Sequence, residues 1–306
     1  MLWRNSARAS SKHRPDKYTY GNNYEIVMQK KISPYIAIRG VYMFNYKIKF
    51  TKKANADGLD DEAVFEIIDD YWGALSNNGQ VVGGFDIFSN GVSVFLTTVL
   101  PEADAISDVN CNDYVKERYM KLKDLFDVEI IQEGINLEWS DSCACKKSSW
   151  YYLFNDYRKE DTPLICGDCN HSVPLYKVPY ILGEKEHFSV LGWQKAHSKM
   201  DGLWAHGLWD RFTYGELSKH NSKLNKEGRK ICKAFEKVLD APVYYFLYYF
   251  EHEDEAGEKH PFIPRGLQNG TPKVCPQCKS EWIDNAGYIK CEKCRLMYDS
   301  LASESN

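Results

Sequence analysis

Four cysteines in two closely spaced pairs are the residues of this chain best suited to chemistry. Cys275 and Cys278 form one C-x-x-C motif, Cys291 and Cys294 form a second, and twelve residues separate the pairs. A C-x-x-C turn lets two thiolates approach one ion, and a hairpin between two such turns brings four sulfurs into a tetrahedral site. Residues 282–289 have the pattern of that hairpin, since turn-forming residues separate two apolar steps. The spacing therefore predicts a zinc ribbon.

A second group of cysteines lies earlier in the chain. Cys143 and Cys145 form a C-x-C motif, and Cys166 and Cys169 form a C-x-x-C motif about twenty residues later. A C-x-C leaves less room for a chelating turn, but four thiolates paired in this way still suit tetrahedral zinc. We therefore expect two structural zinc ions per chain. Two alternatives remain open: some of these thiols are free or redox-active, or His171 replaces a cysteine as ligand.

The abundance of cysteine also bears on the cellular compartment. The chain has 10 cysteines, eight of them in these close pairs, while Cys111 and Cys232 are expected to be small buried side chains. The first 20 residues lack the apolar segment of a secretory signal, and thiols in the cytosol stay reduced. No apolar run is long enough to span a membrane, and the most apolar segment, residues 241–250, suits a buried strand. A cytoplasmic protein without a membrane segment is predicted.

The charge balance limits the classes of partner. With 39 basic and 43 acidic residues the formal net charge is −4, so any contact with nucleic acid must use a local basic patch. The first 20 residues are rich in arginine and serine, and residues 1–40 are expected to form a basic flexible tail and lead-in. A solvated tail and an organellar transit peptide are the two interpretations of this start.

Residues 41–135 show a regular alternation of patterns. A strand pattern at residues 42–50 is followed by a helix with an acidic first turn at Asp60–Glu62, and an Asn90-Gly91 step joins two further strands. A second helix and a last strand complete the order β-α-β-β-α-β, which is the ferredoxin-like plan. No catalytic group is evident here, and the free face of the sheet remains a candidate binding surface. The fold itself hosts many activities.

The overall prediction is an α+β protein. A ferredoxin-like βαββαβ domain at residues 41–135 is followed by a second α+β domain at residues 136–260. This second domain contains the first zinc site and is expected to be held together by zinc. The zinc ribbon at residues 271–298 completes the chain.

The segment 217–239 has the clearest helical pattern of the chain and is predicted to be a helix. Leu224, Ile231, Phe235 and Val238 share one side, and four lysines at intervals of three or four project nearly opposite. Such stripes are usually plain solvated faces, but this one suits phosphate contacts. Five aromatic residues precede the helix and are expected either to stack on bases or to be buried in the core: Trp193, Trp204, Trp209, Phe212 and Tyr214.

Several motifs in one order carry a family resemblance over roughly residues 42–298. They are ICGDCNHSVPLYKVPY, GWQKAHSKMDGLW, LNKEGRKICKAFEKVLDAPVYYFLYYF, VCPQCKSEW and IKCEKCRLMY. Together they resemble an uncharacterised bacterial family described as containing zinc ribbons, with nucleic-acid binding as its expected role. The resemblance implies that Cys166, Cys169, Cys275, Cys278, Cys291 and Cys294 are ligands, with Cys143 and Cys145 completing the first site.

One position departs from the family pattern. The residue after Cys278 is usually glycine, and here it is Lys279. A zinc knuckle favours positive φ at this place, where glycine is free of strain and lysine is mildly strained. The site is expected to survive with slightly altered loop geometry.

Familiar catalytic motifs are absent from the sequence, and zinc held by four cysteines has no open position for a substrate. We therefore expect a non-catalytic protein without a small-molecule substrate, although an enzyme built on dispersed residues such as His197, Asp201, His206 and Asp210 remains an alternative. The leading hypothesis is nucleic-acid binding through a local basic patch. The expected contacts are Lys226, Lys230, Lys233, Lys237, Lys279, Lys290, Lys293 and Arg295. The rival is a protein-interaction module, such as an immunity or antitoxin-like partner whose net acidity covers a basic protein surface.

Overall fold

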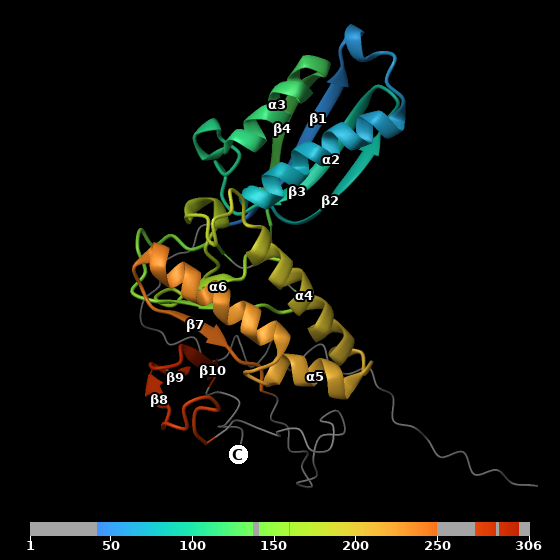
Figure 1. Ribbon diagram of the computed structural model, residues 1–306. Coiled ribbons are helices and arrows are strands. Elements are labelled where there is room, and N and C mark those ends of the chain that lie inside the picture. Colours follow the sequence, from blue (N-terminus) through green and yellow to red (C-terminus); the bar gives the residue numbers. More distant parts are fainter. Residues whose placement is uncertain (1–41, 137–140, 159, 250–272, 286–287, 300–306) are drawn as a thin grey trace, which may run out of the picture. The chain divides into compact units, whose positions relative to one another are not determined.

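The computed structural model describes residues 42–136, 141–158, 160–249, 273–285 and 288–299 (Figure 1). All of them belong to one compact unit, Arg39–Asn306. The tail expected at residues 1–40 and the stretch 250–272 lie outside the described residues. The fold is mixed α+β, with two sheets and two groups of four cysteines.

The first sheet is antiparallel throughout, with the strand order β2-β3-β1-β4. Its strands and helices are β1 (Phe44–Lys52), α2 (Asp61–Asn78), β2 (Val82–Ser89), β3 (Ser93–Leu100), α3 (Asp113–Leu125) and β4 (Phe126–Ile135). Figure 1 shows α2 and α3 on the same face of this sheet. Ile48 lies opposite Leu96 of β3, and Phe50 packs edge-to-face on Phe126, so every second residue of β1 enters a core shared with both helices.

Helix α2 is bounded by a capping aspartate at its start and by a glycine at its end. The Asp60 carboxylate accepts a hydrogen bond from the Ala63 amide at 2.9 Å, which satisfies one of the free donors of the first turn. The helix ends at Gly79, whose φ is +79°. A Cβ atom at Gly79 would lie 2.4 Å from the Cβ of Leu175, so only glycine fits this position.

The second sheet is mixed and has six strands in the order β6-β5-β7-β10-β9-β8. These strands are β5 (Tyr151–Leu153), β6 (Leu164–Cys166), β7 (Val243–Phe246), β8 (Ile283–Asn285), β9 (Tyr288–Cys291) and β10 (Leu296–Asp299). Strand β7 lies in the middle and pairs in parallel with β5 on one side and with β10 on the other. The buried strand expected within residues 241–250 is confirmed as β7.

Three helices pack against one another and on one face of the second sheet: α4 (Phe188–Ala205), α5 (Asp210–Ser218) and α6 (Lys223–Leu239). Leu153, Val243 and Tyr245 point into the core between sheet and helices. The remaining regular elements are short 3₁₀ turns at Ala54–Ala56, Asp108–Asn110 and Leu175–Lys177. No helix among the described residues is both long and apolar enough to cross a membrane.

Helix α6 differs from the helix expected at residues 217–239. It begins at Lys223, because the Ser222 hydroxyl accepts a hydrogen bond from the Asn225 amide and caps a new helix, while Leu217 belongs to α5. Val238 was expected on the buried side but is 41% exposed. The buried stripe is centred on Gly228, and at 3.6 residues per turn Val238 falls on the border of that stripe.

Candidate metal centres

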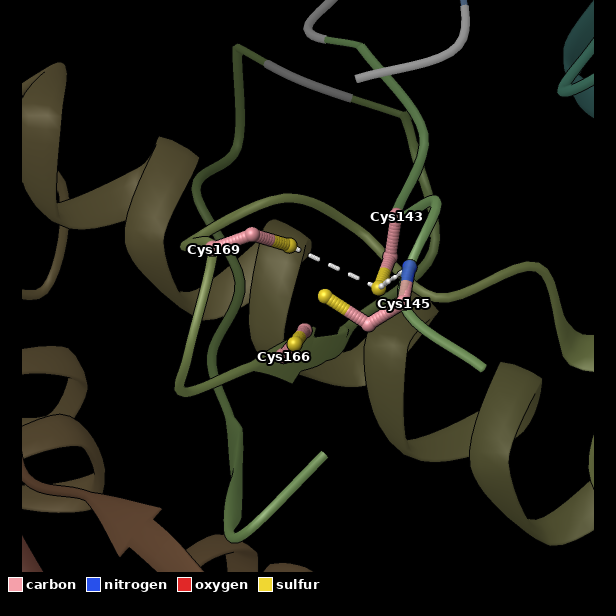
Figure 2. Close-up of side chains that lie close together, drawn as sticks. All are labelled: Cys143, Cys145, Cys166 and Cys169. Carbon is pink, nitrogen blue, oxygen red and sulfur yellow. Dashed lines mark hydrogen bonds between the residues drawn. The ribbon is translucent and has the colours of Figure 1, made fainter. Parts of the chain in front are cut away.

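The first group of four cysteines is assembled from two loops beside the edge strand β6. Figure 2 shows the side chains of Cys143, Cys145, Cys166 and Cys169 turned toward one another. Their sulfur atoms all lie within 4.8 Å of one another, and the Sγ atoms of Cys143 and Cys169 are 3.5 Å apart. Cys166 is the last residue of β6 and pairs with Tyr151 of β5, so the sheet itself fixes one ligand.

The second group lies at the opposite side of the same sheet. Cys275, Cys278, Cys291 and Cys294 place their four sulfurs within 4.8 Å of one another, and 3.6 Å separates the Sγ atoms of Cys278 and Cys291. Strands β8 and β9 form the expected antiparallel hairpin between the two pairs. Cys291 ends β9, and β10 begins two residues after Cys294.

Both groups fit a metal ion. Four thiolates around zinc at about 2.3 Å form a tetrahedron whose sulfurs are about 3.8 Å apart, close to the two separations above. All ten cysteines of the chain are free thiols, so no disulfide competes for these sulfurs. His171 is not one of the residues that bring a ligand atom into the first group. The structure therefore supports two sites of four cysteines each.

The three C-x-x-C turns share one backbone geometry. In each turn the residue after the second cysteine has positive φ, and its amide donates a hydrogen bond to the carbonyl oxygen of the first cysteine at 2.8–2.9 Å. These residues are Asn170 (φ +62°), Lys279 (φ +62°) and Arg295 (φ +53°). The positive φ expected at Lys279 is confirmed. The backbone of all three turns therefore has the conformation expected of a zinc knuckle.

Two of the thiols have a lowered pKa. Hydrogen bonding to Ser280, from its side chain and its backbone, lowers the pKa of Cys278 to about 6. Hydrogen bonds with Cys143 and Cys169 lower the pKa of Cys166, against the opposing effect of burial. Because the thiolate is the metal ligand, each site contains one cysteine that favours the binding form.

Asp168 fastens the loop that follows Cys145 to the turn of the first site. Its carboxylate accepts a hydrogen bond from the Ser149 amide at 2.7 Å and another from the Ser148 hydroxyl at 3.1 Å. The Ser148 Oγ lies 3.2 Å from the Cys166 sulfur. Outer hydrogen bonds of this kind orient the ligands at metal sites.

Trp150 lies between the two centres. The indole packs so closely over Gly167 that a Cβ atom there would be 2.1 Å from the ring, and Gly167 belongs to the first C-x-x-C turn. The Lys290 ammonium lies over the same ring, 3.0 Å from its centroid, and Lys290 directly precedes Cys291. A second link is Asn170, whose Oδ1 accepts a hydrogen bond from the Tyr288 hydroxyl of β9 at 2.8 Å. Side chains therefore connect one centre to the other across the sheet.

Lys290 is one of the eight cations expected to contact nucleic acid, and the structure places it inside. It is 5% exposed, and burial lowers its pKa to about 8. A cation–π contact with Trp150 explains its buried position. The Lys290 ammonium also lies 5.2 Å from the centroid of the Tyr244 ring. Sequence reasoning missed this role because the aromatic partners belong to β7 and to the residue before β5, far away along the chain.

The other seven cations differ in their surroundings. Lys226, Lys230, Lys233 and Lys237 are all exposed on one side of α6, and Lys279 and Lys293 are exposed on the second site's turns. Lys230 lies 3.7 Å from a Glu227 carboxylate oxygen. Arg295 forms ion pairs with Glu236 at 3.1 Å and Glu292 at 2.6 Å, so its charge is largely compensated.

The four residues considered for an enzyme differ in their exposure to solvent. His197 and Asp201 lie one turn apart on α4 and are both 5% exposed, while His206 is exposed and Asp210 begins α5. Burial lowers the pKa of His197 to about 4 and raises the pKa of Asp201 to about 7. Asp201 accepts a hydrogen bond from the Tyr157 amide at 3.0 Å.

We expect Asp201→Asn to stabilise the protein at pH 8 by about 2–4 kcal/mol. The folded state binds the Asp201 proton more tightly than the unfolded state does, because the folded pKa is raised from 3.8 to about 7. The wild type therefore loses stability as the pH rises from about 4 to about 7, and the neutral amide avoids this loss. Urea unfolding between pH 4 and pH 8 measures the difference. An advantage of the variant that does not grow with pH would contradict the burial argument.

Comparisons with known proteins found similarity to a domain and to relatives of unknown function. A family model described as Domain of unknown function (DUF2310) matches residues 145–248, from Cys145 to the residues after β7. A Haemophilus influenzae protein named "Uncharacterized protein" is 26% identical over 238 residues, which is 72% of this chain and 84% of the relative. A second such protein from the same organism is 28% identical over 167 residues, 52% of this chain and 75% of the relative.

Solved structures resemble the chain only over a small part. SnoaB, a cofactor-independent oxygenase from Streptomyces nogalater, is 9% identical with a TM-score of 0.25 and covers 30% of this chain and 91% of its own. A Bacteroides thetaiotaomicron protein described as a possible oxidoreductase is 8% identical with a TM-score of 0.25, over 30% of this chain and 97% of its own. Likeness at this level carries no argument about function.

Proposed function

We propose that the protein is a non-catalytic, cytoplasmic zinc protein that binds nucleic acid through a local basic patch. The ion is assigned as zinc because four thiolates in tetrahedral order are its usual structural set, although iron shares this preference for sulfur. Four protein ligands leave no open position on the ion, so its role is to hold the fold. Two zinc ions would fasten the two sides of the second sheet.

The observation that carries the proposal is the set of cations around His220. The pKa of His220 is lowered by burial and by the nearby positive charges of Arg229, Lys279 and Lys226. The Arg229 guanidinium donates to the His220 carbonyl oxygen at 3.1 Å and to the side chain of Gln277. Cations from α6 and from the first turn of the ribbon therefore meet at one place, which we call the His220 patch.

The exposed lysines of α6 extend the His220 patch along the helix. Lys230, Lys233 and Lys237 follow Lys226 on the same side. Of the two acids on α6, Glu236 is paired with Arg295, whereas Glu227 lies 3.7 Å from Lys230. A row of ammonium groups on one side of a helix matches the phosphates of a nucleic-acid backbone and releases bound counterions. Such contacts give affinity with little choice of sequence.

For the first sheet we propose the ferredoxin-like plan. Support comes from the antiparallel order β2-β3-β1-β4, in which β1 and β3 are the central strands, and from two helices on one face. No cation of the His220 patch comes from this sheet or from its two helices.

The proposal is tested by fluorescence anisotropy with labelled DNA and RNA from 50 to 200 mM salt. We expect binding at low salt whose log–log salt slope falls by about two when Lys226 and Lys279 are both changed to glutamate. Lys116→Glu, an exposed position on α3, is the matched control and should keep the slope of the wild type.

Either of two results would overturn the proposal. One is no binding at micromolar protein in 50 mM salt, which would favour the protein-partner hypothesis. The other is an equal loss of affinity in the control and in the Lys226→Glu, Lys279→Glu variant.

A further inference from the structure

We propose that the bound nucleic acid is single-stranded and that Trp209 and Phe212 stack on its unpaired bases. This inference rests on the proposed function and names its substrate class. The two side chains form an exposed aromatic pair at the start of α5, which we call the α5 aromatic pair.

The structure separates the five aromatic residues that precede α6 into two kinds. Trp193, Trp204 and Tyr214 are at most 8% exposed and belong to the core, whereas Trp209 is 73% exposed and Phe212 is 56% exposed. Burial therefore explains three of the five and leaves the α5 aromatic pair unexplained. Exposed apolar side chains that cluster, unlike single ones, are typical of binding surfaces.

The backbone holds Trp209 outward at a conformational cost. Its φ is +52°, in the left-handed region that bulky side chains rarely adopt. The amides of Phe212 and Thr213 donate to the Trp209 carbonyl oxygen at 2.8 and 3.1 Å, so the first turn of α5 fixes this conformation. Since the exposed indole gains little from burial, the strained backbone points to a binding role.

The two rings and their charged neighbours suit a nucleic-acid strand. Trp209 directly precedes α5 and Phe212 lies in the first turn of that helix, so both exposed rings are at the same end of α5. Arg211 between them and Lys219 at the end of α5 are both exposed. This combination of flat apolar rings with cations complements bases joined by phosphates.

The position of α5 connects the aromatic pair with the lysines of α6. Helix α5 packs against α6, and Figure 1 shows it beside the N-terminal end of that helix. The aromatic pair lies at the start of α5, and the first lysines of α6 follow the end of α5 along the chain. The nine residues of α5 span about 13 Å. A single-stranded nucleic acid that runs along α5 can place its phosphates on the lysines of α6 and its bases on the α5 aromatic pair. Paired bases stay stacked inside a duplex and cannot reach the rings.

The test compares labelled 20-nucleotide poly-dT and poly-U with a 20-base-pair duplex by anisotropy, using the full-length chain. We expect single strands to bind at least tenfold more tightly than the duplex. Trp209→Ala and Phe212→Ala should each lose about tenfold for single strands and leave duplex binding unchanged, whereas Trp209→Phe should stay within about threefold of the wild type. Phe88→Ala removes another exposed ring, 48% exposed on β2, and should change nothing.

Equal losses for single strand and duplex, or no loss in either alanine variant, would overturn the inference. The second outcome would show that the aromatic pair does not contribute to nucleic-acid binding. These results differ from failure of the proposed function, in which the wild type binds none of the three probes. If the Lys226→Glu, Lys279→Glu variant reduces binding and the two alanine variants do not, the basic patch is supported and base stacking is refuted.

Discussion

Cys291→Ser is expected to reduce bound zinc from two ions to one per chain and to unfold the ribbon. A structural zinc ion contributes about 10–16 kcal/mol of apparent folding free energy in small zinc domains, so loss of one thiolate removes most of the stabilisation of its site. The effect should reach further than the ribbon. Leu296 of β10 lies opposite Cys291, and β10 also pairs with β7 at the centre of the sheet.

Metal analysis of protein purified without added zinc measures the stoichiometry, and urea unfolding measures the stability. Cys111→Ser is the matched control because Cys111 lies outside both groups. Its sulfur accepts from Gln80 at 3.4 Å and donates to the Ser107 carbonyl oxygen at 3.4 Å, and a hydroxyl keeps both contacts. Two ions retained in Cys291→Ser, or one lost in Cys111→Ser, would refute the four-plus-four assignment.

Gly228→Ala is expected to destabilise the protein by about 3 kcal/mol. Gly228 lies at the centre of the buried stripe of α6, and a Cβ atom there would be 2.1 Å from the Tyr245 ring and 2.7 Å from the Trp193 indole nitrogen. Tyr245 cannot move aside easily, because it is 1% exposed and its hydroxyl donates to Asn225 at 2.6 Å. The helix and β7 would have to separate.

Gly192→Ala provides the control for this substitution. Gly192 also lies within a helix, α4, but a Cβ atom there meets nothing within 4 Å. Alanine has the higher helix propensity, so this variant should gain about 1 kcal/mol. Thermal or urea unfolding of the two variants should give changes of opposite sign, and a shared sign would contradict the packing between α6 and Tyr245.

The two groups of four cysteines could be predicted from the sequence because the geometry of each C-x-x-C turn is local. A C-x-x-C turn is closed by its own backbone, so the spacing of Cys275 and Cys278 already places two sulfurs together. The positive φ at Lys279 could be predicted for the same reason, and Asn170 and Arg295 repeat it. Strand β7 was equally visible, since a short apolar run suits a buried strand.

Other features depend on partners far away along the chain. The pattern around Lys290 is that of a surface strand, and only the pairing of β9 with β10 brings it over Trp150. Trp204 and Trp209 have similar local sequence, yet one is 8% exposed and the other 73%. The difference arises from the packing of α4 against α5, which no spacing rule reveals.

The strand order of the second sheet has a consequence for how the chain folds during synthesis. Strand β10 is the last described strand along the chain, yet it lies between β7 and β9 and joins the β8–β9 hairpin to the rest of the sheet. Parallel pairs between such distant segments form slowly, because a long loop must close before any contact is gained. Until β10 emerges from the ribosome, β7 has an unpaired edge on that side, which can pair with other chains. A chain interrupted before residue 296 is therefore a candidate for aggregation even with the first cysteine site complete.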